Sequence, residues 1–230
     1  MTLRSRLDGF VACWYDDGML GAEDVRRLLL PFGVSLGDDE VRNVLVYLDL
    51  LLRWNQRINL TAVRDPEECI RRHFGESLFL CRWVELRGRL LDVGSGAGFP
   101  GLALKLVADE LAAVLLEPVA KKRAFLKEVA RCCWLKGVKV RGERLDQLDR
   151  SAGEAPFDLV TTRAVGGLPD LIPGATRCLA PGGKLCLWMG REQCLSVVGG
   201  SVALVWREPI PIPLSQNRVL LIGERIENGG

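Results

Sequence analysis

The sequence predicts an α/β protein whose mainly parallel, seven-stranded sheet is covered by helices on both faces and preceded by a helical cap. From residue 89 onward, short apolar runs alternate with longer segments of helical pattern, as in repeated strand–helix–strand units. These runs are continuously apolar, which is typical of parallel strands that are buried on both faces. The preceding residues show helical patterns only, so we predict a cap over 1–88 and a sheet-containing core over 89–230.

Two helices are predicted within the cap. The first begins near Asp38, a residue type that caps helix N-termini well. Its apolar face follows the helical period and consists of Val41, Val44, Leu45, Leu48, Leu51 and Leu52. The second begins at Asp65-Pro66, because aspartate can cap a helix and proline suits its first turn, and it continues toward Leu86. The polar segment 54–64 links the two helices.

The core alternates strands with helices up to its last two strands. The predicted strands cover 89–93, 112–117, 138–142, 157–162, 184–189, 202–207 and 218–224. The predicted helices cover 100–108, 120–134, 168–179 and 191–198. Three prolines (Pro209, Pro211 and Pro213) leave no room for a helix between the last two strands. We therefore expect these strands to form an antiparallel pair at the edge of the sheet.

Composition limits the classes of protein that fit. The 230 residues are 48% apolar, yet no apolar run reaches the roughly 18 residues that a membrane span needs. The N-terminus lacks the basic start and apolar block of a signal peptide, so a cytoplasmic protein is predicted. Eight cysteines without a CxxC pair and one histidine predict reduced thiols and no zinc or other metal site.

Positive charge is concentrated in one segment, although the net charge of the whole chain is only +2. The segment 121–144 carries two glutamates and nine basic residues: Lys121, Lys122, Arg123, Lys127, Arg131, Lys136, Lys139, Arg141 and Arg144. Such a segment can be a solvated helix face or a surface that faces phosphates. Charge alone does not separate the two interpretations.

The glycine cluster after the first predicted strand favours a particular cofactor. Gly94, Gly96 and Gly98 allow positive φ angles and a close approach of a ligand to the backbone. Dinucleotide-binding loops follow GxGxxG, but Phe99 stands where the third glycine would be. Asp92, just before the loop, suits the cationic end of S-adenosylmethionine better than a pyrophosphate. We therefore predict S-adenosylmethionine, with a nicotinamide or flavin nucleotide as the alternative.

Two further acids follow neighbouring strands at the predicted carboxyl edge of the sheet. The second strand ends at Glu117, whose carboxylate can accept both hydroxyls of a ribose. The third strand is followed by Leu145 and Asp146, an apolar contact and an acid for an adenine ring and its amino group. This arrangement supports an adenosine-containing cofactor.

The chain resembles the ribosomal RNA small-subunit methyltransferase G family. The most specific motifs are Trp54-Asn55, Asn59-Leu60-Thr61, Arg64-Asp65-Pro66, Arg72-His73 and Ser77. The others are the 91–101 loop, Lys121-Lys122-Arg123, Phe125-Leu126, Phe157-Asp158 and Thr162-Arg163-Ala164. The chain departs from the family in its additional N-terminal residues, in Glu76, where aspartate is usual, and in Met189, where lysine is common.

This resemblance implies a class I methyltransferase fold, Rossmann-like and with an N-terminal helical cap. It implies methylation of N7 of a guanine in bacterial 16S rRNA, with naked small-subunit rRNA or a subunit assembly intermediate as substrate and a monomeric enzyme. The implied cofactor contacts are Gly94, Phe99, Glu117, Leu145, Asp146 and Arg163. Because N7 carries a lone pair and no proton, such a transfer needs no general base.

Several side chains have more than one possible role. Arg163, at the end of the fourth predicted strand, is interpreted as a catalytic contact to the cofactor carboxylate or an RNA phosphate, with a surface ion pair as alternative. The predicted RNA contacts are Lys121, Lys122, Arg123, His73 and Arg64. The single histidine can instead be a packed structural residue or an acid–base group. Trp54 is expected to close the cap on the core rather than to stack on a base.

The sequence is also compatible with other functions. The chain could methylate another RNA, a protein or a small molecule, or could be a non-catalytic RNA-binding module that retains the fold. The basic segment 121–144 argues against a small substrate, and the intact loop from Asp92 to Gly98 argues against a module without activity.

Overall fold

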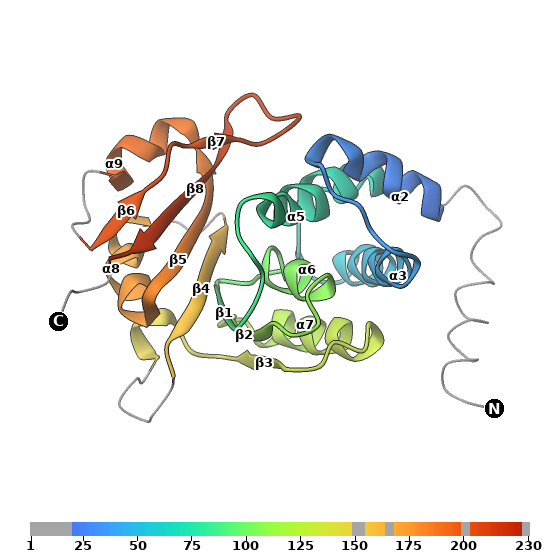
Figure 1. Ribbon diagram of the computed structural model, residues 1–230. Coiled ribbons are helices and arrows are strands. Elements are labelled where there is room, and N and C mark those ends of the chain that lie inside the picture. Colours follow the sequence, from blue (N-terminus) through green and yellow to red (C-terminus); the bar gives the residue numbers. More distant parts are fainter. Residues whose placement is uncertain (1–19, 149–154, 164–167, 199–202, 227–230) are drawn as a thin grey trace.

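The computed structural model describes residues 20–148, 155–163, 168–198 and 203–226. Its centre is a sheet with the strand order β3-β2-β1-β4-β5-β8-β6 (Figure 1). The parallel strands are β1 (Arg89–Val93), β2 (Ala112–Leu116), β3 (Val138–Arg141), β4 (Phe157–Arg163) and β5 (Leu179–Gly190). The antiparallel strands are β6 (Leu204–Trp206), β7 (Ile210–Pro211) and β8 (Arg218–Arg225).

The prediction of an α/β fold with a mainly parallel sheet is confirmed, with three corrections. Over the described residues the sheet has eight strands instead of seven, because Ile210 and Pro211 form the short strand β7 on β8. The last two predicted strands do pair antiparallel, but β8 lies inside the sheet, between β5 and β6. Strand β5 begins at Leu179, earlier than predicted, because Leu179 pairs with Phe157 before a shift in register.

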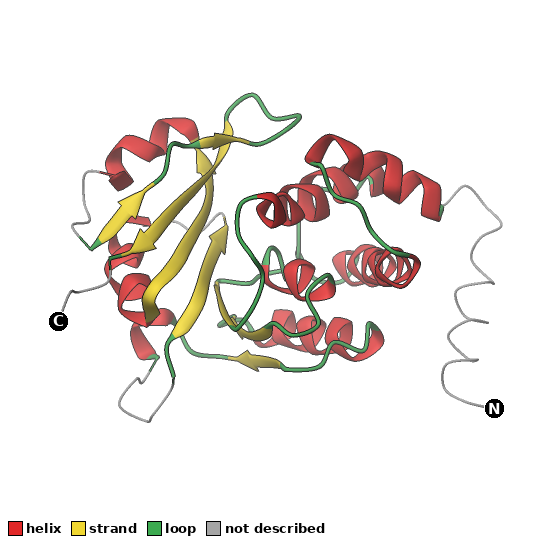
Figure 2. Cartoon of the chain, in the orientation of Figure 1, coloured by secondary structure: helices red, strands yellow, loops and turns green. Residues whose placement is uncertain are grey.

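Helices cover both faces of the sheet, as expected for buried parallel strands (Figure 2). Helices α8 (Leu168–Cys178) and α9 (Cys194–Val198) lie on one face. Helices α6 (Gly101–Leu106) and α7 (Ala120–Cys132) lie on the other face together with the N-terminal helices. Successive residues of β1 serve the two faces, since Leu90 belongs to one apolar cluster and Leu91 to the other.

The N-terminal helices form two runs on the face of the sheet that α6 and α7 also cover. The first run is α2 (Ala22–Leu29), η1 (Leu30–Phe32) and α3 (Asp38–Asn55). The second is α4 (Pro66–Cys69), the π-helical turn η2 (Ile70–Gly75), α5 (Glu76–Leu78) and η3 (Phe79–Arg82). Side chains of both runs share one core with β1, β2, α6 and α7. The division into 1–88 and 89–230 therefore stays a prediction.

The two predicted helix starts have different outcomes. The cap at Asp65 is confirmed, because its side chain accepts a hydrogen bond from the Glu68 N–H at 2.8 Å. The cap at Asp38 is wrong: this residue is the first of α3, and Gly37 holds the N-cap position. There the Glu40 carboxylate accepts the Gly37 N–H at 2.7 Å, which satisfies the helix end from within its first turn.

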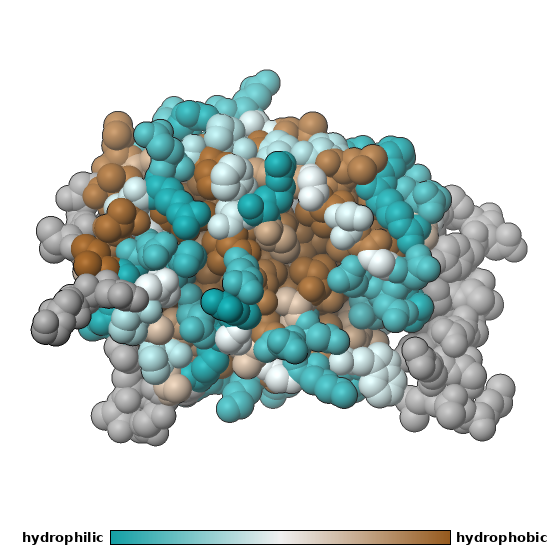
Figure 3. Space-filling model, in the orientation of Figure 1, coloured by the Kyte–Doolittle hydropathy of each residue, from teal (hydrophilic) through white to brown (hydrophobic). Residues whose placement is uncertain are grey.

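The surface of the protein is mixed in polarity. Apolar surface gathers near the centre of one face, between the sheet and the N-terminal helices, and hydrophilic residues surround it (Figure 3). Among the described residues, no helix is long and apolar enough to span a membrane.

Candidate functional site

The glycine loop connects β1 to α6 at the carboxyl edge of the sheet. Gly94, Gly96 and Gly98 have φ angles of 71°, 55° and 89°, so the expected left-handed backbone is confirmed. The N–H groups of Gly94 and Ser95 both donate to the Leu116 carbonyl at 3.0 Å, which ties the loop to β2. A Cβ atom added to Gly96 would meet nothing closer than 3.8 Å. This part of the loop therefore leaves space for a ligand to approach the backbone.

The later glycines of the loop serve packing instead. A Cβ atom on Gly98 would lie 2.2 Å from the Tyr47 hydroxyl oxygen. One on Gly101 would lie 2.6 Å from Asp92 Oδ2 and 2.7 Å from the Leu115 side chain. The same run of small residues thus contains one position that is open toward solvent and two that are closed by other side chains.

Tyr47 of α3 holds the loop from the side of the N-terminal helices. Its buried hydroxyl donates a hydrogen bond of 2.5 Å to the Ala97 carbonyl. Its ring is nearly parallel to Phe99, with centroids 5.0 Å apart, and meets the edge of Phe74 at 5.1 Å. Burial raises the pKa of Tyr47 well above its usual range, so the hydroxyl remains a donor. Sequence reasoning missed this residue, although it continues the apolar face of α3.

His73 packs in the same wall of rings beside the glycine loop as Tyr47, Phe74 and Phe99. Its ring stacks on Phe99 at 4.9 Å, and Nε2 lies 2.8 Å from Thr61 Oγ1. Burial, followed by the positive charge of Arg163, lowers the pKa of His73 to about 3. The ring is therefore neutral near pH 7, which favours the packed role over acid–base work. Its RNA contact stays a prediction.

Asn55 explains the polar motif that precedes His73 in the chain. Its Oδ1 accepts the N–H groups of Leu60 and Thr61 at 2.9 and 3.0 Å, and its Nδ2 donates to the Thr61 carbonyl at 2.9 Å. These bonds fix the linker after α3, so that the Thr61 hydroxyl reaches His73. A chain of contacts thus runs from Asn55 to Phe99 in the glycine loop.

Glu117 lies directly beside the open part of the loop. Its Oε2 accepts the Gly96 N–H at 2.9 Å, and its Oε1 accepts the Val119 N–H at 2.8 Å. Each carboxylate oxygen keeps a lone pair for a further donor. This geometry is compatible with the predicted contact to ribose hydroxyls, which stays a prediction.

The predicted direct contact of Asp92 with a cofactor requires correction. Asp92 has no exposed surface, and its Oδ1 accepts a hydrogen bond of 2.8 Å from the Thr161 hydroxyl. The carboxylate lies beneath the loop because α6 packs against it through Gly101. Burial raises the pKa of Asp92 to about 6, so it still carries a negative charge near pH 7. Its influence on a ligand is therefore electrostatic, through the loop.

Arg163 belongs to a group of charges that we call the Glu76 cluster: the buried Glu76 and the partly buried Arg163 and Arg218. One Glu76 oxygen lies 3.1 Å from Arg163 Nη2, and the other accepts a hydrogen bond of 2.6 Å from Arg218 Nη2. The Trp188 indole N–H donates to the Glu76 backbone carbonyl at 2.7 Å. Burial lowers the pKa of Arg163. Its buried Nη1 has no hydrogen-bond partner among the described residues.

The remaining predicted contacts lie in several places around the loop. Asp146 is exposed in η4 (Leu145–Gln147), after β3, while Leu145 is partly buried and lies near Gly174 of α8. Arg123 donates to the Glu117 and Pro118 carbonyls, at 3.0 and 2.5 Å, which holds the turn before α7. Its RNA contact stays a prediction.

Lys121, Lys122 and Arg64 carry the other predicted RNA contacts. Lys121 and Arg64 are exposed, and Lys122 is half-buried. Arg64 lies in the linker before α4, whereas the two lysines lie in the first turn of α7, next to Glu117. Within the described ranges, no group of acidic, cysteine and histidine residues could hold a metal ion.

Comparisons with known proteins agree with these features. A family model for rRNA small subunit methyltransferase G matches residues 40–198. A ribosomal RNA small subunit methyltransferase G from Chloroflexus aggregans is 38% identical over 218 residues, which are 88% of this chain and 91% of that protein. Its namesake from Halorhodospira halophila is 39% identical over 182 residues, 78% of this chain and 85% of that protein.

Solved structures share the fold at low sequence identity. A ribosomal protein L11 methylase from Lactobacillus delbrueckii subsp. bulgaricus aligns with a TM-score of 0.56 at 16% identity, over 68% of this chain and 80% of that chain. A predicted O-methyltransferase from Agrobacterium tumefaciens aligns with a TM-score of 0.54 at 18% identity, over 66% and 82%. The class I methyltransferase fold is therefore confirmed for the core.

Proposed function

This chain belongs to the rRNA small subunit methyltransferase G family, and we propose that it transfers a methyl group from S-adenosylmethionine to N7 of a guanine in bacterial 16S rRNA. The observation that carries the proposal is the open left-handed backbone at Gly96 beside the Glu117 carboxylate, at the carboxyl edge of β1 and β2. We also propose that the enzyme is cytoplasmic and monomeric and that it acts on naked rRNA or on an assembling subunit.

The residues present fit this cofactor. The backbone at Gly94 and Gly96 would accept its amino-acid part, Glu117 its ribose, and Leu145 with Asp146 its adenine. Arg163 Nη1, which lacks a partner in the described parts of the chain, would donate a hydrogen bond to its carboxylate. Phe99 replaces the third glycine of a dinucleotide loop and is fixed by stacking with Tyr47 and with His73, which favours this assignment over a nicotinamide or flavin nucleotide.

The chemistry requires positioning more than proton transfer. When bound, S-adenosylmethionine supplies a methyl group on a positively charged sulfur. Guanine N7 already offers a lone pair, so the neutral His73 and the sealed Asp92 need not remove a proton. The buried rings of Tyr47 and Phe74 hold Phe99 and the glycine loop in place. A rigid site that orients the base and excludes water can contribute roughly 7–11 kcal/mol.

Charge in the site also suits the reaction. Guanine gains positive charge as it receives the methyl group, and nearby negative groups stabilise that charge. Asp92 and Glu117 place two carboxylates at the loop, whereas the positive charge of Arg163 is partly balanced by Glu76.

Calorimetry on the purified protein tests the cofactor assignment. The wild-type protein should bind S-adenosylmethionine with micromolar affinity, roughly −7 to −8 kcal/mol, and Gly96→Val should abolish binding by filling the open side of the loop. Gly137→Val is the matched control, because Gly137 also has a positive φ, of 70°, and open surroundings but lies before β3. Tight NAD binding without S-adenosylmethionine binding would contradict the proposal.

Mapping of N7-methylguanine in cellular 16S rRNA tests the substrate. We expect one guanine to lose its methyl group when the protein is absent and to regain it when the protein is restored. Purified enzyme should then be offered deproteinised rRNA and assembled small subunits separately. An unchanged methylation map would remove 16S rRNA as the substrate.

A further inference from the structure

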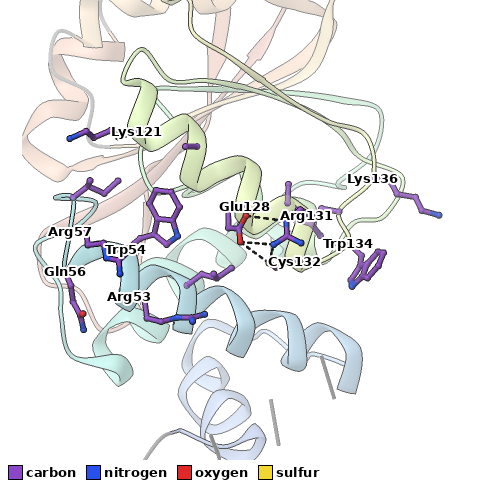
Figure 4. Close-up of a pocket in the computed structure, with 15 residues that line it drawn as sticks. Arg53, Trp54, Gln56, Arg57, Lys121, Glu128, Arg131, Cys132, Trp134 and Lys136 are labelled. Carbon is purple, nitrogen blue, oxygen red and sulfur yellow. Dashed lines mark hydrogen bonds and ion pairs between the residues drawn. The ribbon is translucent and has the colours of Figure 1, made fainter. Parts of the chain in front are cut away.

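A second concave surface lies outside the loop site, along the seam between α3 and α7. This seam groove has a volume of about 1230 Å³ and is lined by residues of α3, of the following turn and of the whole length of α7 (Figure 4). Trp54 forms part of its wall and meets Phe125 edge-on, with centroids 5.7 Å apart. The tryptophan thus joins the N-terminal helices to α7, as the sequence predicted, while one side of it faces the groove.

The seam groove is positively charged. Its lining contains five Lys or Arg side chains and a single acid, Glu128. Arg131 is paired with Glu128 at 2.8 Å, and Arg53 is paired with Asp49. The other three cations, Arg57, Lys121 and Lys136, are exposed and form no ion pair within the described chain. Three cations are therefore free to meet an anionic partner.

Trp134 stands at the far end of the groove in an unusual backbone conformation. Helix α7 ends in a Schellman motif, in which Leu135 N–H donates to the Ala130 carbonyl at 2.9 Å and Trp134 N–H to the Arg131 carbonyl at 3.3 Å. The motif places Trp134 at a φ of 55°, where glycine is the usual residue. Its side chain is 61% exposed. Neither helix termination nor core packing explains a large aromatic ring here.

Helix α7 leads from the loop site to the groove, because it begins three residues after Glu117 and its side chains line the groove. Lys121 lies in the first turn of this helix, close to Glu117, and Trp134 lies just beyond its last turn. A helix of 13 residues is about 20 Å long. A strand that enters the loop site could therefore continue past Lys121 along the helix to Trp134.

We propose that the seam groove binds a single-stranded segment of the RNA substrate, next to the target nucleotide. Arg57, Lys121 and Lys136 contact its phosphates, and an unpaired base stacks on Trp134. Unpaired cations supply the electrostatic part of such binding, and exposed aromatic rings supply stacking that tolerates any base. This inference rests on the proposed function, because it assigns the path of the RNA that the loop site would methylate.

Fluorescence anisotropy with a labelled single-stranded RNA oligonucleotide of mixed sequence tests the base contact in the full-length protein. Trp134→Gly should lower the affinity about tenfold through the loss of one stacked base. Its melting temperature should not fall, because glycine suits the left-handed position better. Trp134→Phe keeps an aromatic ring and should retain most of the affinity. Unchanged RNA binding by Trp134→Gly overturns the proposal. If this variant keeps its RNA affinity but no longer self-associates, the groove joins two copies of the chain instead of binding RNA.

A pair of lysine variants tests the phosphate contacts. Lys136→Ala should reduce the salt dependence of RNA binding by roughly one slope unit, as for one lost phosphate contact. Lys139→Ala removes the same charge from an exposed position on β3, outside the groove, and should leave the slope unchanged. Equal slopes for the two variants would contradict a specific phosphate path.

Methylation assays separate this inference from the proposed function. If the wild-type enzyme methylates small-subunit rRNA, Trp134→Gly should raise the KM for rRNA while S-adenosylmethionine affinity stays constant. If the wild-type enzyme is active and the KM for rRNA is unaltered in Trp134→Gly, only the proposed RNA binding in the groove is overturned. Wild-type enzyme that methylates neither naked nor assembled rRNA overturns the proposed function, whatever the oligonucleotide experiment gives.

Discussion

The glycine loop and the Glu76 cluster lie where the N-terminal helices meet the sheet, yet opposite kinds of interaction hold them. The loop is fixed by neutral contacts: the Tyr47 hydroxyl on Ala97 and the stacked ring of Phe99. The cluster is fixed by buried charge, one carboxylate between two guanidinium groups. The first arrangement gives shape that depends little on salt. The second keeps one positive charge in excess and, within the part of the chain that the structure describes, a buried guanidinium nitrogen without a hydrogen-bond partner.

Glu76→Ala should have the largest effect on stability. The change leaves Arg163 and Arg218 close together without a counter-charge, and breaking a buried pair in this way costs about 3–5 kcal/mol. Urea denaturation should show this loss, and part of it should return in the double variant Glu76→Ala with Arg163→Ala. A loss below about 1 kcal/mol would mean that the cluster is open to water.

Arg163→Ala should affect methylation more than stability. Glu76 keeps Arg218 as a partner, so we expect the melting temperature to change by only a few degrees. The loss of a charge-assisted contact to the cofactor carboxylate or an RNA phosphate costs about 2–4 kcal/mol, or roughly 30- to 1,000-fold in rate. Arg163→Lys should restore little activity if the contact is bidentate. Near-normal methylation by Arg163→Ala would leave this residue a structural role only.

Tyr47→Phe tests the glycine loop, which neutral contacts hold in place. The variant keeps the stacked ring but leaves the buried Ala97 carbonyl without its donor, at a cost of about 1–2 kcal/mol. The affinity for S-adenosylmethionine should fall several-fold and should remain equally insensitive to salt. Calorimetry at two salt concentrations measures both effects. A strong salt dependence in the variant alone would show that charge also holds the loop.

The smallest effect is expected from the titration of His73, because its influence on stability appears only below neutral pH. Folding lowers the pKa of His73 to about 3, so its contribution to stability is complete above about pH 6.5 and is lost as the pH falls toward 3. Asp92, whose pKa folding raises to about 6, acts in the opposite direction between about pH 4 and 6. The difference between the wild type and His73→Gln isolates the histidine.

Proton NMR can follow the imidazole directly, because the chain has one histidine. Its ring signals should not titrate between pH 5 and 8. A midpoint near the usual value, about 6.5, would show that water reaches the ring and that the wall beside Phe99 is open.

The sequence predicted those parts of the molecule that depend on neighbouring residues. Continuous apolar runs located the strands, and the spacing of Gly94, Gly96 and Gly98 predicted the left-handed loop, because backbone preference is local. Asp65 was a correct helix cap for the same reason. Asp38 failed because the adjacent Gly37 also suits an N-cap, and the Glu40 side chain favours that register.

Contacts between distant segments were beyond such reasoning. Arg218 meets Glu76 across 142 positions in the chain, and no local pattern pairs them. Nothing in the sequence singled out Tyr47, since the hydrogen-bond partner of its hydroxyl is a backbone carbonyl 50 positions away. Asp92 was placed on the correct edge of the sheet, but only the packing of Gly101 against it shows that it is sealed.

The position of β8 has a consequence for how the molecule is made. This strand lies between β5 and β6 although both precede it in the sequence, and it carries Arg218 into the Glu76 cluster. During synthesis on a ribosome, the sheet edges of β5 and β6 must wait until residues 218–225 emerge. The same segment brings the second guanidinium to Glu76, so the insertion of β8 into the sheet also completes the charged site. A polypeptide that lacks residues 218–225 would therefore hold the glycine loop without the finished Glu76 cluster.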